Sequence, residues 1–315
     1  MIPEKTNVVP IQGVQSVHRG RWLRVNREDA STLAVVRKLT GADLTRASFS
    51  SFTVEGGFSY IPVTFIDETS RARTIMRVVF AVSRDVVISL EPIPTSVALN
   101  NALKRMERDG RESDAPFEIV ADIFQAIADG TDTLVGQLND QVERLMVETN
   151  AVLANLEVKA RDFGVTDVAS TQVDLADTEE FLSRCMESQL ALVRAARHLR
   201  ARALTDDPNI RVVFDTLIQD IEAIEQNVEF VHDRVRFLQQ VNNMALNVKQ
   251  NQIVKVFSVI TAVFLPSMLV TTFYSMNIEH MPILQWKYGE PTVMLLTFLF
   301  ALLPLLYIKQ RGWLR

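Results

Sequence analysis

The sequence predicts a membrane protein of the α+β class, and three observations support this fold class. β-branched and aromatic runs of strand length lie before about residue 95, which indicates a small α/β domain at the N-terminus. Helical periodicity dominates after that point and includes one very long helix. Two uncharged apolar stretches occupy most of the last sixty or so residues. The expected order is therefore an α/β domain, a helical domain and two membrane-spanning helices.

The N-terminal domain is predicted from three runs that are rich in β-branched and aromatic residues. These runs cover residues 58–66, 75–82 and 86–90, and the Ser-Arg-Asp segment 83–85 between the last two is typical of a hairpin turn. A helix is expected at about residues 28–39. The composition of this region therefore predicts a mixed sheet with at least one helix.

The helical region begins with the start signal Ser113-Asp114-Ala115-Pro116, which predicts a helix to about Lys159. Residues 162–175 are interpreted as a loop and residues 177–204 as a second helix. The Asp-Asp-Pro segment 206–208 is interpreted as a break.

From Pro208 onward neither proline nor glycine occurs until Pro266, so a single helix of more than 50 residues is expected to run from the cytosol into the membrane. Its apolar residues recur at alternating steps of four and three, the pattern of helix-on-helix packing. These residues are Leu217, Ile221, Ile224, Val228, Val231, Val235 and Leu238. The seam predicts lateral packing, either on the chain's own helices or on copies of the chain.

The two apolar stretches, residues 256–274 and 291–308, are close to the ~20 residues that a helix needs to cross a bilayer. Aromatic residues flank them where the interfacial belts of a membrane protein lie. These are Tyr274, Trp286, Tyr288, Tyr307 and Trp313. The alternative is a pair of buried core helices in a soluble protein.

Basic residues predict the orientation of the spans. Lys249 and Lys255 precede the first span, and Lys309, Arg311 and Arg315 follow the second. The intervening loop carries Glu279, His280, Lys287 and Glu290. By the positive-inside rule, both termini are expected in the cytoplasm of a cell whose inner (plasma) membrane holds the protein.

Composition excludes several function classes. The net charge of −5 argues against nucleic acid as a partner. The four histidines are widely scattered, no glycine-rich phosphate loop occurs, and no carboxylate pair suggests a catalytic dyad, so an enzyme is not expected. The single cysteine, Cys185, is interpreted as a structural thiol.

A second stripe on the long helix mixes amides and hydroxyls with apolar groups as it enters the first span. It comprises Asn247, Asn251, Val254, Ser258, Thr261, Leu265 and Met268. Polar positions on one face of a membrane helix usually face protein or water rather than lipid. Hydrogen bonding between helices is an equally good interpretation of the spacing, and because two spans are too few to enclose a pore, an ion pathway requires an oligomer.

The C-terminal motifs resemble those of the CorA family of magnesium channels. The matching segments are 250–258 (QNQIVKVFS), 264–266 (FLP), Tyr274-Ser275-Met276-Asn277, Met281-Pro282 and Trp313-Leu314, in family order over about 65 residues. The family signature Gly-Met-Asn is matched by Ser275, Met276 and Asn277, with serine in place of glycine. The loop also has Ile283 where the family often has glutamate, which leaves Glu279 as the main acidic residue of the external loop.

The resemblance implies a funnel-shaped homopentamer in the lipid bilayer that binds divalent cations and needs no cofactor. The implied parts are a cytosolic α/β domain (1–112), outer helices (113–205), a stalk helix (206–255), a pore-lining first span (256–274), an external loop (275–290), a second span (291–308) and a basic cytosolic tail (309–315). The implied function is passive, potential-driven influx of Mg²⁺, and also of Co²⁺ and Ni²⁺, gated by cytosolic divalent ions.

The resemblance also implies roles for individual residues. The selectivity filter would be Tyr274, Ser275, Met276 and Asn277, and the pore lining or gate would be Asn251, Val254, Phe257, Leu265 and Met268. A feedback sensor would use Asp215 and Asp220 of the stalk with Asp43 of the N-terminal domain. Residues 206–250 carry eight acidic and four basic side chains, so a solvated acidic face is the alternative explanation for the stalk aspartates.

Two further functions remain open from the sequence. Within the same superfamily, a ZntB-like zinc transporter is the nearest alternative, although Met276 and Asn277 favour Mg²⁺ over Zn²⁺. From a different class, a non-conducting membrane scaffold or sensor with the same fold would retain these helices without transporting ions.

Overall fold

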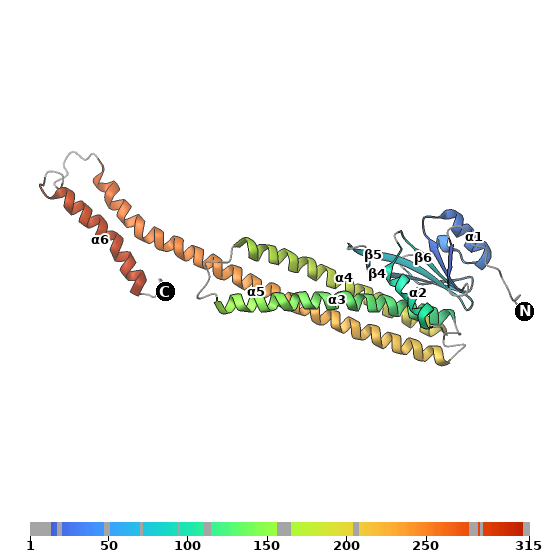
Figure 1. The fold of residues 1–315 in the computed structure, drawn as a ribbon. Coiled ribbons are helices and arrows are strands. Elements are labelled where there is room, and N and C mark those ends of the chain that lie inside the picture. The colour runs from blue at the N-terminus through green and yellow to red at the C-terminus, as the bar shows by residue number, and fades with distance from the viewer. Residues whose placement is uncertain are drawn as a thin grey trace, which may run out of the picture. The chain divides into compact units, whose positions relative to one another are not determined.

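The computed structural model describes residues 14–17, 21–46, 51–69, 72–93, 95–109, 115–155, 165–203, 208–276, 283 and 286–310 (Figure 1). The chain divides into two compact units. The first comprises Met1–Ala151 with Thr171–Gln239, and the second comprises Val152–Ser170 with Gln240–Arg315.

The first unit contains a six-stranded mixed sheet in the order β1-β2-β6-β5-β4-β3. The strands are β1 (Val14–Val17), β2 (Trp22–Asn26), β3 (Thr53–Glu55), β4 (Phe58–Thr69), β5 (Ala72–Val82) and β6 (Val87–Glu91). β2 and β6 pair in parallel, and the other neighbours are antiparallel. The predicted strands correspond to β4, β5 and β6, and the predicted turn at 83–85 is confirmed, because Ser83 N donates to Val86 O at 3.0 Å.

Both faces of the central strands are buried, which explains why their sequences are almost continuously apolar. In β5, Val78 and Phe80 face one apolar cluster while Val79 and Ala81 face another. The first cluster includes residues of α2 (Val97–Asp109) and of the long helices. The second lies under α1 (Ala30–Thr40) and the short 3-10 helix η1 (Leu44–Arg46).

The limits of α1 follow from its capping residues, and they confirm the helix expected at residues 28–39. Asp29 accepts hydrogen bonds from the backbone N–H groups of Ser31 and Thr32. The hydroxyls of Ser31 and Thr32 also donate to Asp29. These two hydrogen bonds, with Ser31 as the larger contributor, lower the pKa of Asp29 to about 2. Gly41 ends the helix at φ 80°, a left-handed conformation that glycine adopts without steric cost.

A buried polar network joins β2, β6 and α2. Arg24 Nε and Nη2 donate to Glu91 Oε1 at 2.8 Å and Oε2 at 2.7 Å, and both side chains are 4 % exposed. Arg24 Nη1 donates to Asn100 Oδ1 at 2.6 Å. Ser89 Oγ donates to Glu91 Oε1 at 2.7 Å and accepts from Trp22 Nε1 at 3.0 Å. Each charge in this network therefore has a partner.

Three long helices pack beside the sheet in the first unit: α3 (Pro116–Asn155), α4 (Val165–Ala203) and the first part of α5 (Pro208–Tyr274) (Figure 1). The predicted seam of α5 is confirmed as a buried face that packs on the chain's own helices. Leu217 and Ile221 join the cluster that also contains Phe124 of α3 and Leu192 of α4. Val228 and the seam residues after it join a second helical cluster with residues of the same helices.

The loop predicted at 162–175 is wrong from Val165 onward, where α4 already begins. The polar residues of this segment suggested a loop, but no glycine or proline follows Gly164 until Pro208. Leu175, which is 2 % exposed, also anchors the segment in the helical core.

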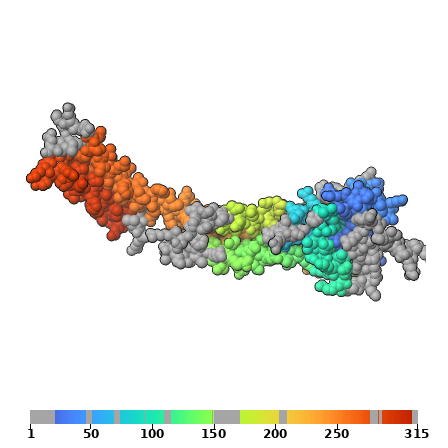
Figure 2. All heavy atoms as spheres, turned by 45° about the horizontal axis from the view of Figure 1, so that its top comes forward, coloured from blue at the N-terminus to red at the C-terminus, as the bar shows by residue number. Residues whose placement is uncertain are grey.

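In the second unit, the end of α5 packs against α6 (Gly289–Gln310) (Figure 2). Both helices are long and apolar enough to cross a membrane. The mean hydropathy of the qualifying 18-residue window is 2.2 in α5 and 2.1 in α6. Only 6 % of each window is buried within the chain, whereas the core helix of a soluble protein is mostly buried. The exposure of these helices therefore favours membrane spans over the buried-core alternative.

Candidate functional site

One face of α5 is covered by α6. Val259, Val263 and Pro266 are half-buried, Val270 is buried, and at about 3.6 residues per turn all four lie along one side of the helix. Ser267 lies at the edge of this side, and its Oγ is 3.4 Å from the backbone oxygen of Thr297 in α6. The two apolar helices therefore form a hairpin with a defined contact face.

The opposite side of α5 is uncovered within the chain, and we call it the free face. It consists of Asn251, Val254, Ser258, Thr261, Leu265 and Met268, all of which are exposed. Val254 is 56 %, Leu265 59 % and Met268 69 % exposed. Four of the five predicted pore-lining residues belong to this face, and the fifth, Phe257, lies beside it.

The free face continues to the end of α5. Thr272 and Ser275 follow Leu265 and Met268 at the same spacing, and both are exposed. Ser275 Oγ donates to Thr272 O at 2.9 Å, and Ser275 N donates to Thr271 O at 3.0 Å in the ordinary helical pattern. A side chain with a Cβ is thus accommodated where the family signature has glycine. Thr272 was not predicted from the sequence, although it continues the stripe at the same spacing.

The C-terminal end of α5 carries a partial negative charge, which attracts cations. The last carbonyl groups of a helix lack partners within it, and the negative end of the helix dipole lies there. Tyr274 is the last residue of α5, and Met276 beyond it is 55 % exposed. The other two predicted residues of this region, Asn277 and Glu279, lie outside the described residues.

The predicted sensor aspartate of the N-terminal domain, Asp43, is already engaged. Its carboxylate lies 3.2 Å from Arg37 Nη2 and accepts from Thr45 Oγ1 at 2.6 Å. Its backbone N–H donates to Tyr60 Oη at 2.9 Å. Burial raises the pKa of Tyr60, so this hydroxyl remains protonated at neutral pH.

The two stalk aspartates differ in their surroundings. Asp215 Oδ1 lies 2.6 Å from Arg200 Nε, and its Oδ2 lies 3.8 Å from Arg211 Nε. Asp220 is exposed and has no hydrogen bond or ion pair with another described residue. Within one chain, no group of three or more His, Cys, Asp or Glu side chains in the described ranges is arranged to hold a metal ion.

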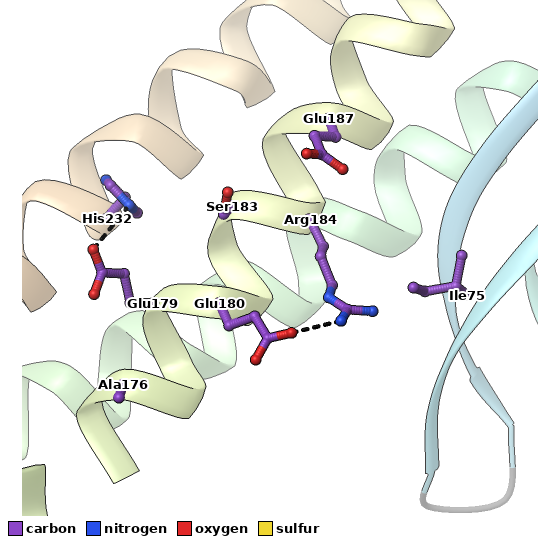
Figure 3. A pocket seen from close by; sticks show the side chains of 8 residues that line it. All are labelled: Ile75, Ala176, Glu179, Glu180, Ser183, Arg184, Glu187 and His232. Carbon is purple, nitrogen blue, oxygen red and sulfur yellow. Dashed lines mark hydrogen bonds and ion pairs between the residues drawn. The ribbon is translucent and has the colours of Figure 1, made fainter. Parts of the chain in front are cut away.

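A surface pocket of about 550 Å³ lies between β5, α4 and α5 (Figure 3). It is lined by Ile75, Ala176, Glu179, Glu180, Ser183, Arg184, Glu187 and His232. Glu179 accepts from Gln239 Nε2 at 2.8 Å and lies 3.8 Å from His232 Nε2. Glu180 pairs with Arg184 at 2.5 Å. Because most of its carboxylates have partners within the chain, the pocket does not have the donor set of a cation site.

The family model described as "CorA-like Mg2+ transporter protein" matches residues 22–310, which is most of the chain. The chain belongs to this family. Magnesium transport protein CorA of Haemophilus ducreyi is 33 % identical over 200 residues, covering 63 % of this chain and 59 % of that protein. The match therefore spans about three fifths of the length of that relative.

Solved structures show the same fold. The CorA magnesium transporter from Methanocaldococcus jannaschii matches with a TM-score of 0.74 and 15 % identity, covering 93 % of this chain and 90 % of that one. The ZntB cytoplasmic domain from Vibrio parahaemolyticus matches with a TM-score of 0.52 and 14 % identity, covering 71 % of this chain and 86 % of that one. At these identities the likeness is one of fold alone.

Membership in the CorA family confirms the predicted fold class and the assignment of the chain to a family of transporters rather than enzymes. It also assigns α6 and the end of α5 to the membrane. The roles of the individual filter, pore and sensor residues remain predictions.

Proposed function

We propose that this chain is one subunit of a homopentameric Mg²⁺ channel of the CorA type in the plasma membrane, with both termini in the cytoplasm. The observation that carries the proposal is the free face of α5, which lies opposite the contact with α6 and is exposed along its whole length. Influx is passive and is driven by the membrane potential and the concentration gradient.

The free face supports an oligomeric pore on physical grounds. A face that mixes an amide and hydroxyls with large apolar side chains suits neither pure lipid nor bulk water. When copies of the chain surround a common axis, Asn251, Ser258 and Thr261 supply oxygen atoms to it. Leu265 and Met268 supply apolar rings that close a narrow pore by excluding water. Val254 and Phe257 are assigned to a second constriction nearer the cytoplasm.

At the outer mouth, a ring of Asn277 carboxamides accepts hydrogen bonds from the water shell of the ion. Mg²⁺ releases its water reluctantly, so recognition through outer-shell contacts avoids the cost of dehydration. Neutral amides bind weakly enough to release the ion again, and the negative ends of the α5 helices lie nearby. Co²⁺ and Ni²⁺ are expected to pass as well, because they also form octahedral water shells.

Cytosolic divalent ions are proposed to gate the channel by bridging carboxylates of neighbouring subunits. Asp220 is the strongest candidate because it is exposed and makes no ion pair with another described residue. Asp215 and Asp43 are the other candidates, and a bound cation would have to compete with Arg200 and Arg37 for them.

Replacement of Asp220 by asparagine is expected to weaken feedback inhibition, since the amide retains the size of the side chain but removes its charge. The internal Mg²⁺ concentration that halves uptake should rise by roughly fivefold or more. Uptake into liposomes preloaded with graded Mg²⁺ measures this shift. The matched control is Asp233→Asn, which neutralises another exposed aspartate of α5. An equal shift in both variants would mean that general stalk charge, and not a site, controls gating.

The proposed function is tested by Mg²⁺ uptake into proteoliposomes that contain a Mg²⁺-sensitive dye, with a negative internal potential. Cobalt hexammine, a mimic of the hydrated ion, is expected to block this uptake. A positive result requires uptake that depends on potential and is blocked by the mimic. Zn²⁺ uptake without Mg²⁺ uptake would favour the ZntB-like alternative, and no flux of either ion from a verified oligomer would favour the non-conducting scaffold.

A further inference from the structure

The apolar core of the three-helix bundle in the first unit is divided into two clusters. One cluster extends to Ala128 of α3, Leu192 of α4 and Ile221 of α5. The other begins at Leu134 of α3, Cys185 of α4 and Val228 of α5. Between them lie Gly130, Thr131, Ser188 and Gln189, which we call the polar layer. Ile224 is the partly buried apolar residue that touches both clusters.

Two side chains of the polar layer are buried without hydrogen-bond partners among the described residues. Gln189 is fully buried, and neither its Oε1 nor its Nε2 has a partner. Ser188, which is 2 % exposed, also has an unpaired Oγ. Thr131 donates its hydroxyl back to Ile127 O at 3.2 Å in its own helix, which leaves its donor unavailable to Gln189. An apolar side chain of similar size at position 189 would avoid this desolvation cost.

Helix α3 also has a low helix propensity within the polar layer. Gly130 lies in the interior of α3, where glycine has a lower helix propensity than any residue except proline. A Cβ added to Gly130 would meet nothing within 4 Å, so packing does not require glycine there. Gly130 also does not have the positive φ that would favour glycine. Two independent features of the layer therefore reduce its stability.

We propose that the polar layer is a flex point of the bundle, at which α3 and α4 separate transiently during the transport cycle. Opening an apolar cluster exposes only apolar surface to water, which is unfavourable. Opening the polar layer instead lets water satisfy the amide of Gln189 and the hydroxyl of Ser188, so less free energy is lost there. The role in transport rests on the proposed function, whereas the local weakness does not.

The test uses the full-length oligomer in lipid nanodiscs, with amide hydrogen exchange as the first measurement. Gln189→Met removes the unpaired amide at similar volume, and Gly130→Ala strengthens α3. Each variant is expected to slow exchange in residues 126–135 and 185–193 by roughly 5- to 30-fold and to raise Tm by about 2 to 4 °C. Each should also lower Mg²⁺ uptake relative to the wild type.

Matched controls separate this effect from general stabilisation. Gly136→Ala changes another glycine of α3 that has no neighbour within 4 Å of an added Cβ, and Gln219→Met changes an exposed glutamine of α5. Gly136→Ala removes the same propensity penalty from α3, so it should raise Tm as Gly130→Ala does but leave exchange in residues 185–193 of α4 and Mg²⁺ uptake unchanged. Gln219→Met should leave Tm, exchange and uptake unchanged.

A lower Tm for Gln189→Met, or unchanged exchange in both layer variants, would overturn the proposal because the layer would not be weak. Slower exchange with unchanged uptake would overturn its role in transport. If the wild type itself transports no Mg²⁺, the proposed function fails. The comparison of exchange between the wild type and the two layer variants then still decides whether the layer is locally weak, because that comparison does not depend on transport.

Discussion

Alanine in place of Asn277 should abolish Mg²⁺ uptake while leaving the oligomer assembled. The substitution removes the carboxamide oxygen that we propose accepts hydrogen bonds from the water shell of the ion. Alanine has no side-chain oxygen to replace it. Uptake should fall to the level of empty liposomes. The measurement is dye-reported flux, combined with size-exclusion chromatography and light scattering to establish the oligomeric state.

The control is Asn101→Ala, which removes an exposed amide from α2, outside the membrane-spanning segments. It should retain wild-type uptake. Undiminished flux through Asn277→Ala would refute the filter assignment, and dissociation of the variant would mean that Asn277 serves assembly instead.

Replacing Glu91 by alanine should cause a large loss in the free energy of unfolding. The change leaves the guanidinium of Arg24, which is 4 % exposed, without the carboxylate that neutralises it. Removing one partner of a buried ion pair typically costs ~3–5 kcal/mol. That is a large fraction of the ~5–15 kcal/mol by which a domain is usually stable. Thermal unfolding of the full chain in detergent, followed by circular dichroism, measures the loss.

A double substitution distinguishes the cost of an orphaned charge from the cost of a lost contact. Arg24→Met with Glu91→Leu removes both charges and fills the space with apolar atoms, so it should be considerably more stable than Glu91→Ala alone. If the double variant is as unstable as the single one, the hydrogen bonds to Ser89 and Asn100, and not the unpaired charge, determine the stability of this region.

Local sequence patterns were sufficient where burial and secondary structure repeat along the chain. The strands β4 to β6 were predictable because both their faces are apolar, and the buried seam of α5 was predictable from its heptad spacing. β2 was not predicted, since Arg24 interrupts its apolar residues and is neutralised by Glu91, 67 residues away. A pattern confined to a short window contains no information on such a partner.

In the candidate site, too, local spacing was predictable from the sequence, whereas contacts with residues distant in the chain were not. Spacing placed Asn251, Val254, Leu265 and Met268 on one face of α5, where the structure also has them. The ion pair between Asp215 and Arg200 was not predicted, because it depends on the register of the α4–α5 hairpin. In the proposed oligomer, the residues opposite the free face belong to other copies of the chain, so neither local sequence patterns nor the fold of one subunit identifies them.

The hydroxyl groups of α5 also bear on how such a protein is made. Ser258 Oγ donates to Val254 O at 2.7 Å, and Thr271 Oγ1 donates to Met268 O at 2.9 Å, so each hydroxyl proton is satisfied by the helix that carries it. A newly synthesised chain with these bonds does not expose unpaired donors at Ser258 and Thr271 to acyl chains. In the proposed oligomer, insertion of the hairpin and the later association of subunits are thus separable steps of biogenesis.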